Sequence, residues 1–263
     1  MITTYLMGGL GNQMFQYAMG RASAARLGVE LQLDNSSYGP KYRHPYDLPF
    51  WSGVTERVVY GDGAYYRVCE DGMPYNPDTL EKITKECTLY GYWQTEKYFD
   101  AVRPELLEAF RPRVVRTPVE QMSDLIKRLH NSVSLHVRRT DYVGSSVHGV
   151  PLEDYYRHAL AAVSEKVSSP CVFVFTDDPA WVSMRLMPTI NHTKMLVSGK
   201  GFSGPEEMWL MSQCQHSILA NSSYSWWGAW LNDSPDRVVT APKQWFVNGP
   251  DSRDIIPDRW LKI

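Results

Sequence analysis

Hydrophobic residues along the chain follow two repeating patterns. Short apolar runs such as ITTYLM (2–7), VELQLD (29–34) and CVFVFTD (171–177) are typical of buried strands. Segments with helical spacing of apolar residues alternate with these runs, as at 13–27 and 152–166. Strands that alternate with helices in this order predict an α/β fold with mostly parallel, doubly wound sheets.

The pattern also divides the chain into two parts. Residues 35–100 are irregular and rich in Tyr, Pro and Gly, with one clear strand at 87–93. The basic segment RPRVVRTP (111–118) contains two prolines and is the best candidate for a linker. Since 263 residues suffice for two modest domains, we expect an N-terminal α/β domain at 1–117 and a C-terminal α/β domain at 118–263. The strands expected in the second domain are 133–138, 171–177, 195–198, 217–221 and 237–242.

Composition and charge narrow the choice of partners. The formal net charge of −2 gives no reason to expect nucleic acid as the main partner. Nine Trp and sixteen Tyr either fill a core or stack against sugars and bases. The four cysteines form no C-x-x-C pair, so we expect reduced, mostly buried thiols. No export signal is visible, so we expect a cytoplasmic protein with at most peripheral membrane association.

The segment VSLHVRRTD (133–141) joins an apolar strand to two arginines. Strand alternation places His136 and Arg138 on one face, whereas Arg139 begins the following loop. Ligands of open α/β sheets bind beyond the carboxyl ends of the strands. Arginine suits a bidentate grip on phosphate or carboxylate, so an anion site is expected here. The alternative is that one arginine pairs with Asp141 and the other is solvated.

Two aspartates follow the strand at 171–177. Asp178 precedes Pro179 and is a good helix N-cap, which leaves Asp177 as the residue that faces a ligand. Adjacent carboxylates diverge from a strand end, and the D-x-D spacing of a metal site is missing. We therefore expect no catalytic metal and no cofactor.

The segment SILANSSYSWWGAWL (217–231) places a polar turn before an aromatic helix. Backbone N–H groups at the helix start, together with Ser222 and Ser223, form an anion site, or the serines are simply the N-cap. The tryptophans of this helix are expected to pack in the core.

The Gly-rich segment GGLGNQMFQ (8–16) follows the first strand. Gly9-x-Gly11 together with Asp34 resembles a dinucleotide fingerprint, but Met14 replaces the third glycine, so a nicotinamide dehydrogenase is only a minor alternative. Asn12 and Gln13 at the helix start suit a phosphate or a sugar.

Six segments taken together resemble the bacterial α-1,2-fucosyltransferases of glycosyltransferase family 11. They occur in order from residue 8 onward. The resemblance implies a GT-B fold, with two Rossmann-like domains facing a central cleft. It also implies inverting, metal-independent transfer of L-fucose from GDP-L-fucose to O2 of a terminal β-galactoside. The segments are GGLGNQMFQYA (8–18), LYGYWQTEKYF (89–99), HVRRTDYV (136–143), FTDD (175–178), NSSYSWWGAWLN (221–232) and DIIPDRW (254–260).

The resemblance also implies roles for individual residues. Arg138 would hold the β-phosphate of the donor, with Arg139 beside it, and His136 and Asp177 would lie near the nucleoside. The second domain would therefore hold GDP-fucose, and the first domain would hold the acceptor. Further residues expected to bind the donor are Ser222, Ser223, Asn12 and Gln13.

The general base is not identified by the sequence. Asp141 is the candidate that belongs to the motif, and an aspartate beside two arginines is often a structural partner instead. Thr140 departs from the family, since bacterial relatives commonly have Gly and α-1,6 enzymes have Thr, which bears on linkage. The alternatives are an inactive sugar- or nucleotide-binding module and a fucosyltransferase of α-1,6 or O-linked specificity. Other candidates for the base are His148, Glu153 and Asp34.

Overall fold

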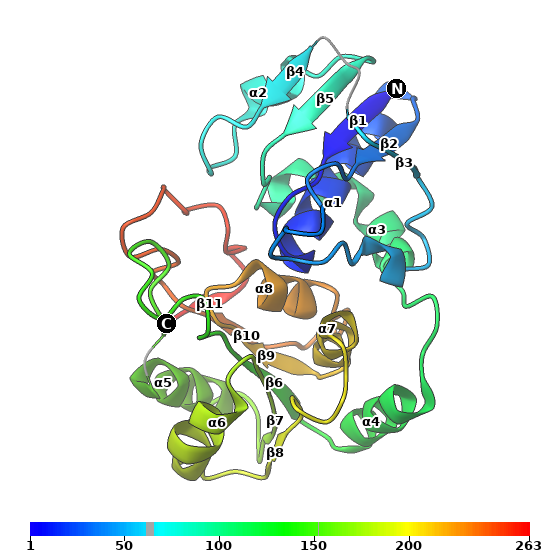
Figure 1. Cartoon of the computed structure of the whole chain (residues 1–263). Coiled ribbons are helices and arrows are strands. Elements are labelled where there is room, and N and C mark those ends of the chain that lie inside the picture. Colours follow the sequence, from blue (N-terminus) through cyan, green and yellow to red (C-terminus); the bar gives the residue numbers. More distant parts are fainter. Residues whose placement is uncertain (62–65, 152) are drawn as a thin grey trace. The chain divides into compact units, whose positions relative to one another are not determined.

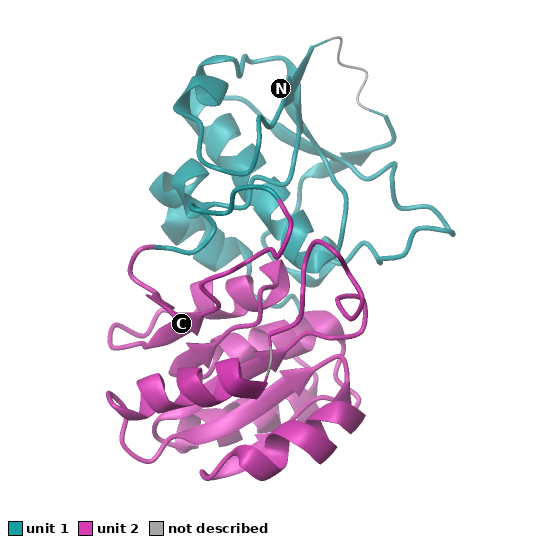
Figure 2. Ribbon diagram, turned by 90° about the vertical axis from the view of Figure 1, so that its left-hand side faces the viewer, with its two compact units in different colours: residues 1–114, 250–257 teal, residues 115–249, 258–263 magenta. Residues whose placement is uncertain are grey.

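The chain folds into two α/β units, each built on its own sheet (Figures 1 and 2). The computed structural model describes residues 1–61, 66–151 and 153–263. Unit 1 comprises Met1–Val114 and Pro250–Pro257, and unit 2 comprises Val115–Gly249 and Asp258–Ile263. All named strand pairs in the two sheets are parallel, which confirms the predicted fold class of two Rossmann-like α/β domains.

The sheet of unit 1 has the strand order β3-β2-β1-β5-β4. The strands predicted at 2–7 and 29–34 are present as β1 and β2, and the long helix between them begins at Leu10, earlier than the predicted Gln13. It can begin there because the extended Gly9 serves as its N-cap. The bounds are β1 Ile2–Tyr5, α1 Leu10–Leu27, β2 Leu31–Asp34, η1 Leu48–Phe50, β3 Arg57–Val59, β4 Arg67–Cys69, α2 Pro77–Glu81, β5 Cys87–Tyr90, η2 Glu96–Tyr98, η3 Asp100–Val102 and α3 Arg103–Ala109.

The sheet of unit 2 has the strand order β11-β10-β9-β6-β7-β8. Helices α5 and α6 lie on one side of this sheet, and α4 and α7 lie on the other (Figure 1). The bounds are α4 Thr117–Arg128, β6 Ser132–Val137, α5 Glu153–Ser164, β7 Cys171–Thr176, α6 Pro179–Trp181, a π-helical turn η4 Val182–Leu186, η5 Met187–Thr189, β8 Lys194–Leu196, α7 Gly204–Ser212, β9 His216–Ile218, α8 Ser223–Trp230, β10 Val239–Ala241 and β11 Leu261–Lys262.

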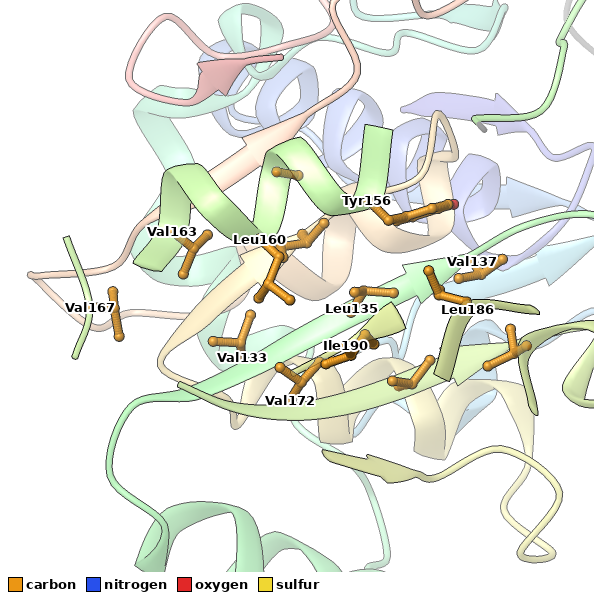
Figure 3. Close-up of a cluster of buried hydrophobic side chains, with 14 residues drawn as sticks. Val133, Leu135, Val137, Tyr156, Leu160, Val163, Val167, Val172, Leu186 and Ile190 are labelled. Atoms are coloured by element: carbon orange, nitrogen blue, oxygen red, sulfur yellow. The ribbon is translucent and has the colours of Figure 1, made fainter. Parts of the chain in front are cut away.

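The core of unit 2 follows the alternation predicted for its central strand. The odd-numbered apolar side chains of β6 pack together under α5 and beside η4, as Figure 3 shows. The opposite face therefore carries the even-numbered residues Ser134 and His136. The tryptophans of α8 are fully buried and pack against one another and against Trp260, so their predicted packing role is confirmed.

Residues 250–257 return to unit 1, whereas the sequence suggested one unbroken second domain from residue 118. Asp254 explains this return, because its carboxylate pairs with Lys97 and accepts the backbone N–H of Tyr75 at 2.9 Å. These partners are separated from Asp254 by more than 150 positions in the chain. No periodicity in the segment signals such a contact.

The boundary segment itself is anchored to unit 2 by an ion pair. Arg116 contacts both carboxylate oxygens of the buried Glu206, at 2.6 and 2.7 Å. The hydrogen bonds from Arg116 lower the pKa of Glu206 to about 2. This pair fixes the start of α4 against the start of α7, so the predicted linker ends in an ordered contact.

Two further sequence predictions concern the cysteines and the membrane. All four cysteines are free thiols, and Cys87, Cys171 and Cys214 are buried, as expected. Among the helices in the described part of the chain, none has the length and apolar character needed to cross a membrane.

The Gly20→Ala variant is expected to unfold at a lower temperature than the wild type. Alanine normally favours a helix interior by about 1 kcal/mol over glycine. Here a Cβ atom would lie 2.2 Å from Thr4 Oγ1 and 2.8 Å from Leu31 Cδ1, both in buried strands. Overpacking of this kind costs roughly 1–3 kcal/mol, so destabilisation outweighs the helix preference. Thermal unfolding followed by circular dichroism measures the difference.

Gly204→Ala is the matched control, because its Cβ would enter open space in the first turn of α7. This variant should unfold at the wild-type temperature or slightly above it. An equal shift for both glycine variants would show that close packing of α1 is not the cause.

Candidate functional site

Polar loops gather at the carboxyl edge of the unit 2 sheet, beyond three adjacent strands. The loop after β6 carries Arg138 to Asp141, the loop after β7 carries Asp177 and Asp178, and the turn after β9 carries Asn221 to Ser223. β6 lies between β7 and β9 in the sheet, so these loops are neighbours. This is the edge at which ligands bind in open α/β sheets.

Arg138 lies between two carboxylates. Its Nε atom is 2.8 Å from Asp141 Oδ1, and its Nη1 atom is 3.3 Å from Asp177 Oδ2. Burial alone would lower the pKa of Arg138, but the hydrogen bond with Asp141 and the charge of Asp177 outweigh it and raise the pKa. The guanidinium group is therefore a permanent charge in a fixed orientation, with 27% of the side chain still exposed.

Arg139 has a different environment. Its Nε atom lies 3.2 Å from Asp178 Oδ2, and its guanidinium carbon lies 4.0 Å from the ring centre of Trp181. The alternative from the sequence had one arginine paired with Asp141 and the other solvated. The structure pairs Arg138 with Asp141, and Arg139 is ion-paired and stacked rather than solvated.

Asp178 caps the helix that follows it, as predicted. Its Oδ1 atom accepts the backbone N–H of Trp181 at 3.1 Å. The same carboxylate thus holds both Arg139 and the start of α6.

Asp177 holds the loop after β6. Its Oδ1 atom accepts the backbone N–H of Arg139 at 2.8 Å, and its Oδ2 atom accepts the backbone N–H and the hydroxyl of Thr140 at 3.1 and 2.6 Å. The sequence predicted that Asp177 faces a ligand, and its contact with a nucleoside stays a prediction. What the structure shows is a carboxylate that fixes the backbone next to Arg138.

His136 is a buried, neutral imidazole. Burial first, and the charge of Arg138 second, lower the pKa of His136 to about 3. Its ring lies 5.3 Å from that of Tyr224, and its Nδ1 atom has no hydrogen-bond partner among the residues the structure describes. The histidine therefore presents an unsatisfied nitrogen inside the site, without positive charge at neutral pH.

The start of α8 lies beside this cluster. Ser222 is the N-cap, and its hydroxyl accepts the backbone N–H of Tyr224 at 3.3 Å, while Ser223 opens the helix. Ser222 also hydrogen-bonds with the hydroxyl of Tyr142, whose ring lies 5.7 Å from the guanidinium carbon of Arg138. We call the loop after β6, residues 138–141, the arginine loop. Tyr142 thus links the arginine loop to the start of α8, a connection that no pattern in the sequence predicted.

Of the four candidates for the general base, His148 and Asp141 lie near Arg138. His148 stacks on Tyr142 at 4.4 Å, and its Nδ1 atom lies 3.1 Å from Ser145 Oγ. Burial lowers the pKa of His148, and Asp141 and Arg138 are close enough to shift it in opposite directions. His148 therefore joins Asp141 near Arg138.

The other two candidates for a base are engaged elsewhere. Glu153 pairs with Arg185 at 3.1 Å on α5. Asp34 belongs to unit 1, where it accepts the backbone N–H groups of Ser36 and Gly61. None of these contacts involves a residue of the arginine loop.

Asn12 and Gln13 lie in unit 1, at the start of α1. Gln13 is buried, and its amide donates to the carbonyls of Pro45 and Gly8 and accepts the N–H of Asp47. Asn12 Oδ1 accepts a hydrogen bond from Gln94 at 2.7 Å. Gln13 thus holds the neighbouring loop in place, and the predicted contacts of both residues with the donor stay predictions.

Two more residues at the carboxyl edge of the unit 2 sheet were missed by the sequence analysis. Ser198 donates to Glu207 Oε2 at 2.6 Å and accepts the backbone N–H of Thr176, the last residue of β7. Burial raises the pKa of Glu207 to about 7. A sequence signal for this pair is lacking, because a glutamate in the first turn of a helix is common.

A cluster of three or more metal-ligating side chains is not found within residues 1–61, 66–151 and 153–263. The expectation of a metal-independent reaction is not tested by this observation.

Comparisons with known proteins agree with these features. The chain is 30% identical over 286 residues to an α-1,2-colitosyltransferase of Escherichia coli, covering 100% of this chain and 98% of the relative. It is 32% identical over 306 residues to the O-antigen biosynthesis glycosyltransferase WbnK of Escherichia coli, covering 98% and 99%. The crystal structure of NodZ α-1,6-fucosyltransferase soaked with GDP-fucose matches with a TM-score of 0.53 at 14% identity, covering 88% and 92%.

The likeness to NodZ shows a shared fold, which supports the GT-B-like class predicted from the sequence. The family itself follows from the sequence matches. The family model described as "Glycosyl transferase family 11" matches residues 76–260, which is more than half of the chain. Together with the two relatives that align over nearly their full length, this match shows that the chain belongs to glycosyl transferase family 11.

Proposed function

We propose that this family 11 glycosyltransferase transfers L-fucose from GDP-L-fucose to O2 of a terminal β-galactoside, with inversion and without a metal ion. The observation that carries the proposal is that Arg138 and the start of α8 follow the carboxyl ends of two adjacent strands, β6 and β9. The α-1,2 linkage in the name of one relative supports the choice of O2. L-fucose is supported by more distant relatives, such as the mouse galactoside 2-α-L-fucosyltransferase Sec1, at 26% identity.

The chemistry explains why these groups suit a nucleotide-sugar donor. As the bond between the sugar and the β-phosphate breaks, negative charge grows on the leaving GDP. Arg138 and the N–H groups at the start of α8 are preorganised donors for that charge. Each such donor is worth on the order of a few kcal/mol in the transition state. The bonds that orient Arg138 come from Asp141 and Asp177, so the guanidinium need not reorganise during the reaction.

Inversion requires the acceptor hydroxyl to lose its proton as it attacks the anomeric carbon. Asp141 is the motif residue, and it is held by Arg138 at 2.8 Å. His148 is the second group of the same cluster that can accept a proton, because its lowered pKa keeps it neutral at pH 7. Both are assigned to this step as candidates within the proposal, with Asp141 first.

Thr140 does not argue for a different linkage. Its hydroxyl and its N–H both donate to Asp177, so the side chain stabilises the arginine loop. The presence of threonine at this position is explained by that contact within unit 2.

A second candidate is transfer of colitose by the same site. One relative with 30% identity is an α-1,2-colitosyltransferase, and colitose is L-fucose without the 3-hydroxyl group. The phosphate-binding groups would serve both donors equally, since the two sugars differ only at C3.

The test is a transfer assay with purified protein. With GDP-fucose and lactose, GDP should be released, and NMR should show an α-1,2-fucosylated galactose. Activity should persist in EDTA. Saturable GDP binding without transfer to any glycan of a broad panel would indicate an inactive binding module instead. A higher kcat/KM with GDP-colitose would favour the second candidate, and an α-1,6-linked product would contradict the proposed linkage.

A further inference from the structure

Four tyrosines form a cluster at the carboxyl edge of the unit 1 sheet. Tyr5 ends β1 and Tyr90 ends β5, and their rings stack with centres 5.0 Å apart and planes at 29°. Tyr92 follows two residues later, and Tyr42 comes from the loop after β2. Tyr42 lies close enough to Tyr5 and Tyr92 to shift their pKa values, and Tyr90 does the same to Tyr92, so the four side chains lie near one another. We call these four residues the tyrosine platform.

The tyrosine platform is exposed although its residues are large. Tyr42, Tyr90 and Tyr92 retain 37%, 38% and 36% of their accessible surface. Single exposed aromatic residues are common and need no explanation, but several together mark a binding surface. The position at the carboxyl ends of parallel strands is where α/β sheets bind ligands. Packing within the core does not account for rings that stay accessible.

The tyrosine platform is also held rigidly. The hydroxyl of Tyr42 accepts the backbone N–H of Gly8 at 2.7 Å. Glu70, which follows β4, accepts the backbone N–H groups of Tyr92 and Trp93 at 2.7 and 2.9 Å. Rigid aromatic rings lose little conformational entropy when a ligand stacks on them. The tyrosine platform is therefore preorganised for binding.

The chemistry of the tyrosine platform fits a neutral sugar. A tyrosine ring offers an apolar face and a hydroxyl at its edge, and a sugar ring offers C–H groups on its face and hydroxyls at its edge. In β-galactose the axial 4-hydroxyl leaves the hydrogens of C3, C4 and C5 on one side of the ring, where they can stack on an aromatic face.

We propose that the tyrosine platform binds the terminal galactose of the acceptor, with Tyr90 and Tyr92 in contact with the sugar. This inference rests on the proposed function, since it assigns the acceptor subsite of that reaction. Glu70 acts as a positioning residue that fixes the backbone of Tyr92.

The test is a kinetic comparison of Tyr90→Ala and Tyr92→Ala with the wild type. Each variant should raise the KM for lactose about tenfold, because one stacked ring is lost. The KM for GDP-fucose and the slow hydrolysis of GDP-fucose without acceptor should stay unchanged. Tyr66→Ala is the matched control. Tyr66 is 46% exposed and immediately precedes β4, so it lies at the amino ends of the strands, whereas the tyrosine platform lies at their carboxyl ends. It should leave all three quantities unchanged.

Three results would overturn the proposal. An unchanged KM for lactose in both variants would remove the rings from the acceptor site. A rise in the KM for GDP-fucose instead would assign the tyrosine platform to the donor, and an equal effect of Tyr66→Ala would show a nonspecific loss. Tyr90→Ala also removes a stacking partner of Tyr5, so thermal unfolding is measured for each variant, and Tyr92→Ala keeps the test independent of that stack.

Binding is also measured without catalysis, so that failure of the proposed function is recognised separately. Saturation-transfer NMR with methyl β-galactoside should show contact in the wild type and in Tyr66→Ala, and a weaker signal in Tyr92→Ala. Methyl β-glucoside should bind less well, because its equatorial 4-hydroxyl changes the stacking face. A wild type that binds the galactoside but transfers no sugar would contradict the proposed reaction and support the platform. Sugar transfer by the wild type, together with an unchanged KM for lactose in both tyrosine variants, would support the proposed reaction and contradict the role of the tyrosine platform.

Discussion

Arg138→Ala is expected to lower kcat for sugar transfer by about 10²–10³-fold, the typical loss when one preorganised donor to a developing negative charge is removed. The guanidinium group is fixed by Asp141 and Asp177 at 2.8 and 3.3 Å and stays partly exposed at the strand edge. Its charge is therefore available to the leaving phosphate in a set direction. Steady-state kinetics with GDP-fucose measures the effect.

The matched control is Arg128→Ala, since that arginine is exposed on α4 and lies 3.9 Å from its nearest carboxylate. Its kcat should equal that of the wild type. Arg138→Ala also removes a positive charge from beside two carboxylates, so a second variant, Arg138→Lys, keeps a positive charge there. We expect Arg138→Lys to unfold near the wild-type temperature and to recover only part of kcat, because lysine lacks the bidentate fork. Unchanged turnover in Arg138→Ala would remove this residue from the proposed role.

Asp177→Asn is expected to lower kcat by about 10–100-fold with little change in the affinity for GDP. The amide NH2 group of asparagine would replace either Oδ1, which accepts the N–H of Arg139, or Oδ2, which accepts the N–H and the hydroxyl of Thr140. A hydrogen bond to a charged group contributes about 1.5–3 kcal/mol, so losing one would loosen the loop. Because Arg138 lies on that loop, its orientation toward the reacting phosphate would be lost. Kinetics together with calorimetric titration of GDP separates the two quantities.

The control for Asp177→Asn is Asp154→Asn, an exposed carboxylate on α5 that pairs only with Arg157 among the ion pairs of the described residues. It should leave kcat unchanged. The family resemblance implies that Asp177 lies near the nucleoside, and that role predicts a different result. If the dissociation constant for GDP rises as much as kcat falls, Asp177 contacts the nucleotide directly and is more than a positioning residue.

Local patterns in the sequence predicted much of unit 2. The alternation of Val133, Leu135 and Val137 identified the buried face of β6, because side chains along a strand alternate between the two faces of the sheet. Asp178 before Pro179 identified a helix N-cap for the same kind of local reason. Six motifs in order identified the family, since they are distributed over most of the chain.

Contacts between residues far apart in the chain were not predictable in this way. The sequence offered Asp141 as the partner of one arginine, but the second carboxylate beside Arg138, that of Asp177 after β7, was known only once the fold placed it there. Residues 250–257 pack in unit 1 because Asp254 reaches Lys97 and Tyr75. The tyrosine platform is assembled from the ends of two strands and a distant loop.

The difference between the features that the sequence predicted and those that only the fold revealed has a physical cause. Strand and helix periods, caps and turns depend on residues within a few positions of one another, so a single sequence determines them. The roles of charged and aromatic residues depend on which strands pair in the sheet, and that pairing comes from burial summed over the whole domain. For this chain the sequence therefore established the family and the strand ends that carry its polar residues. The fold established that Asp177 orients Arg138 and that four tyrosines meet at the edge of unit 1.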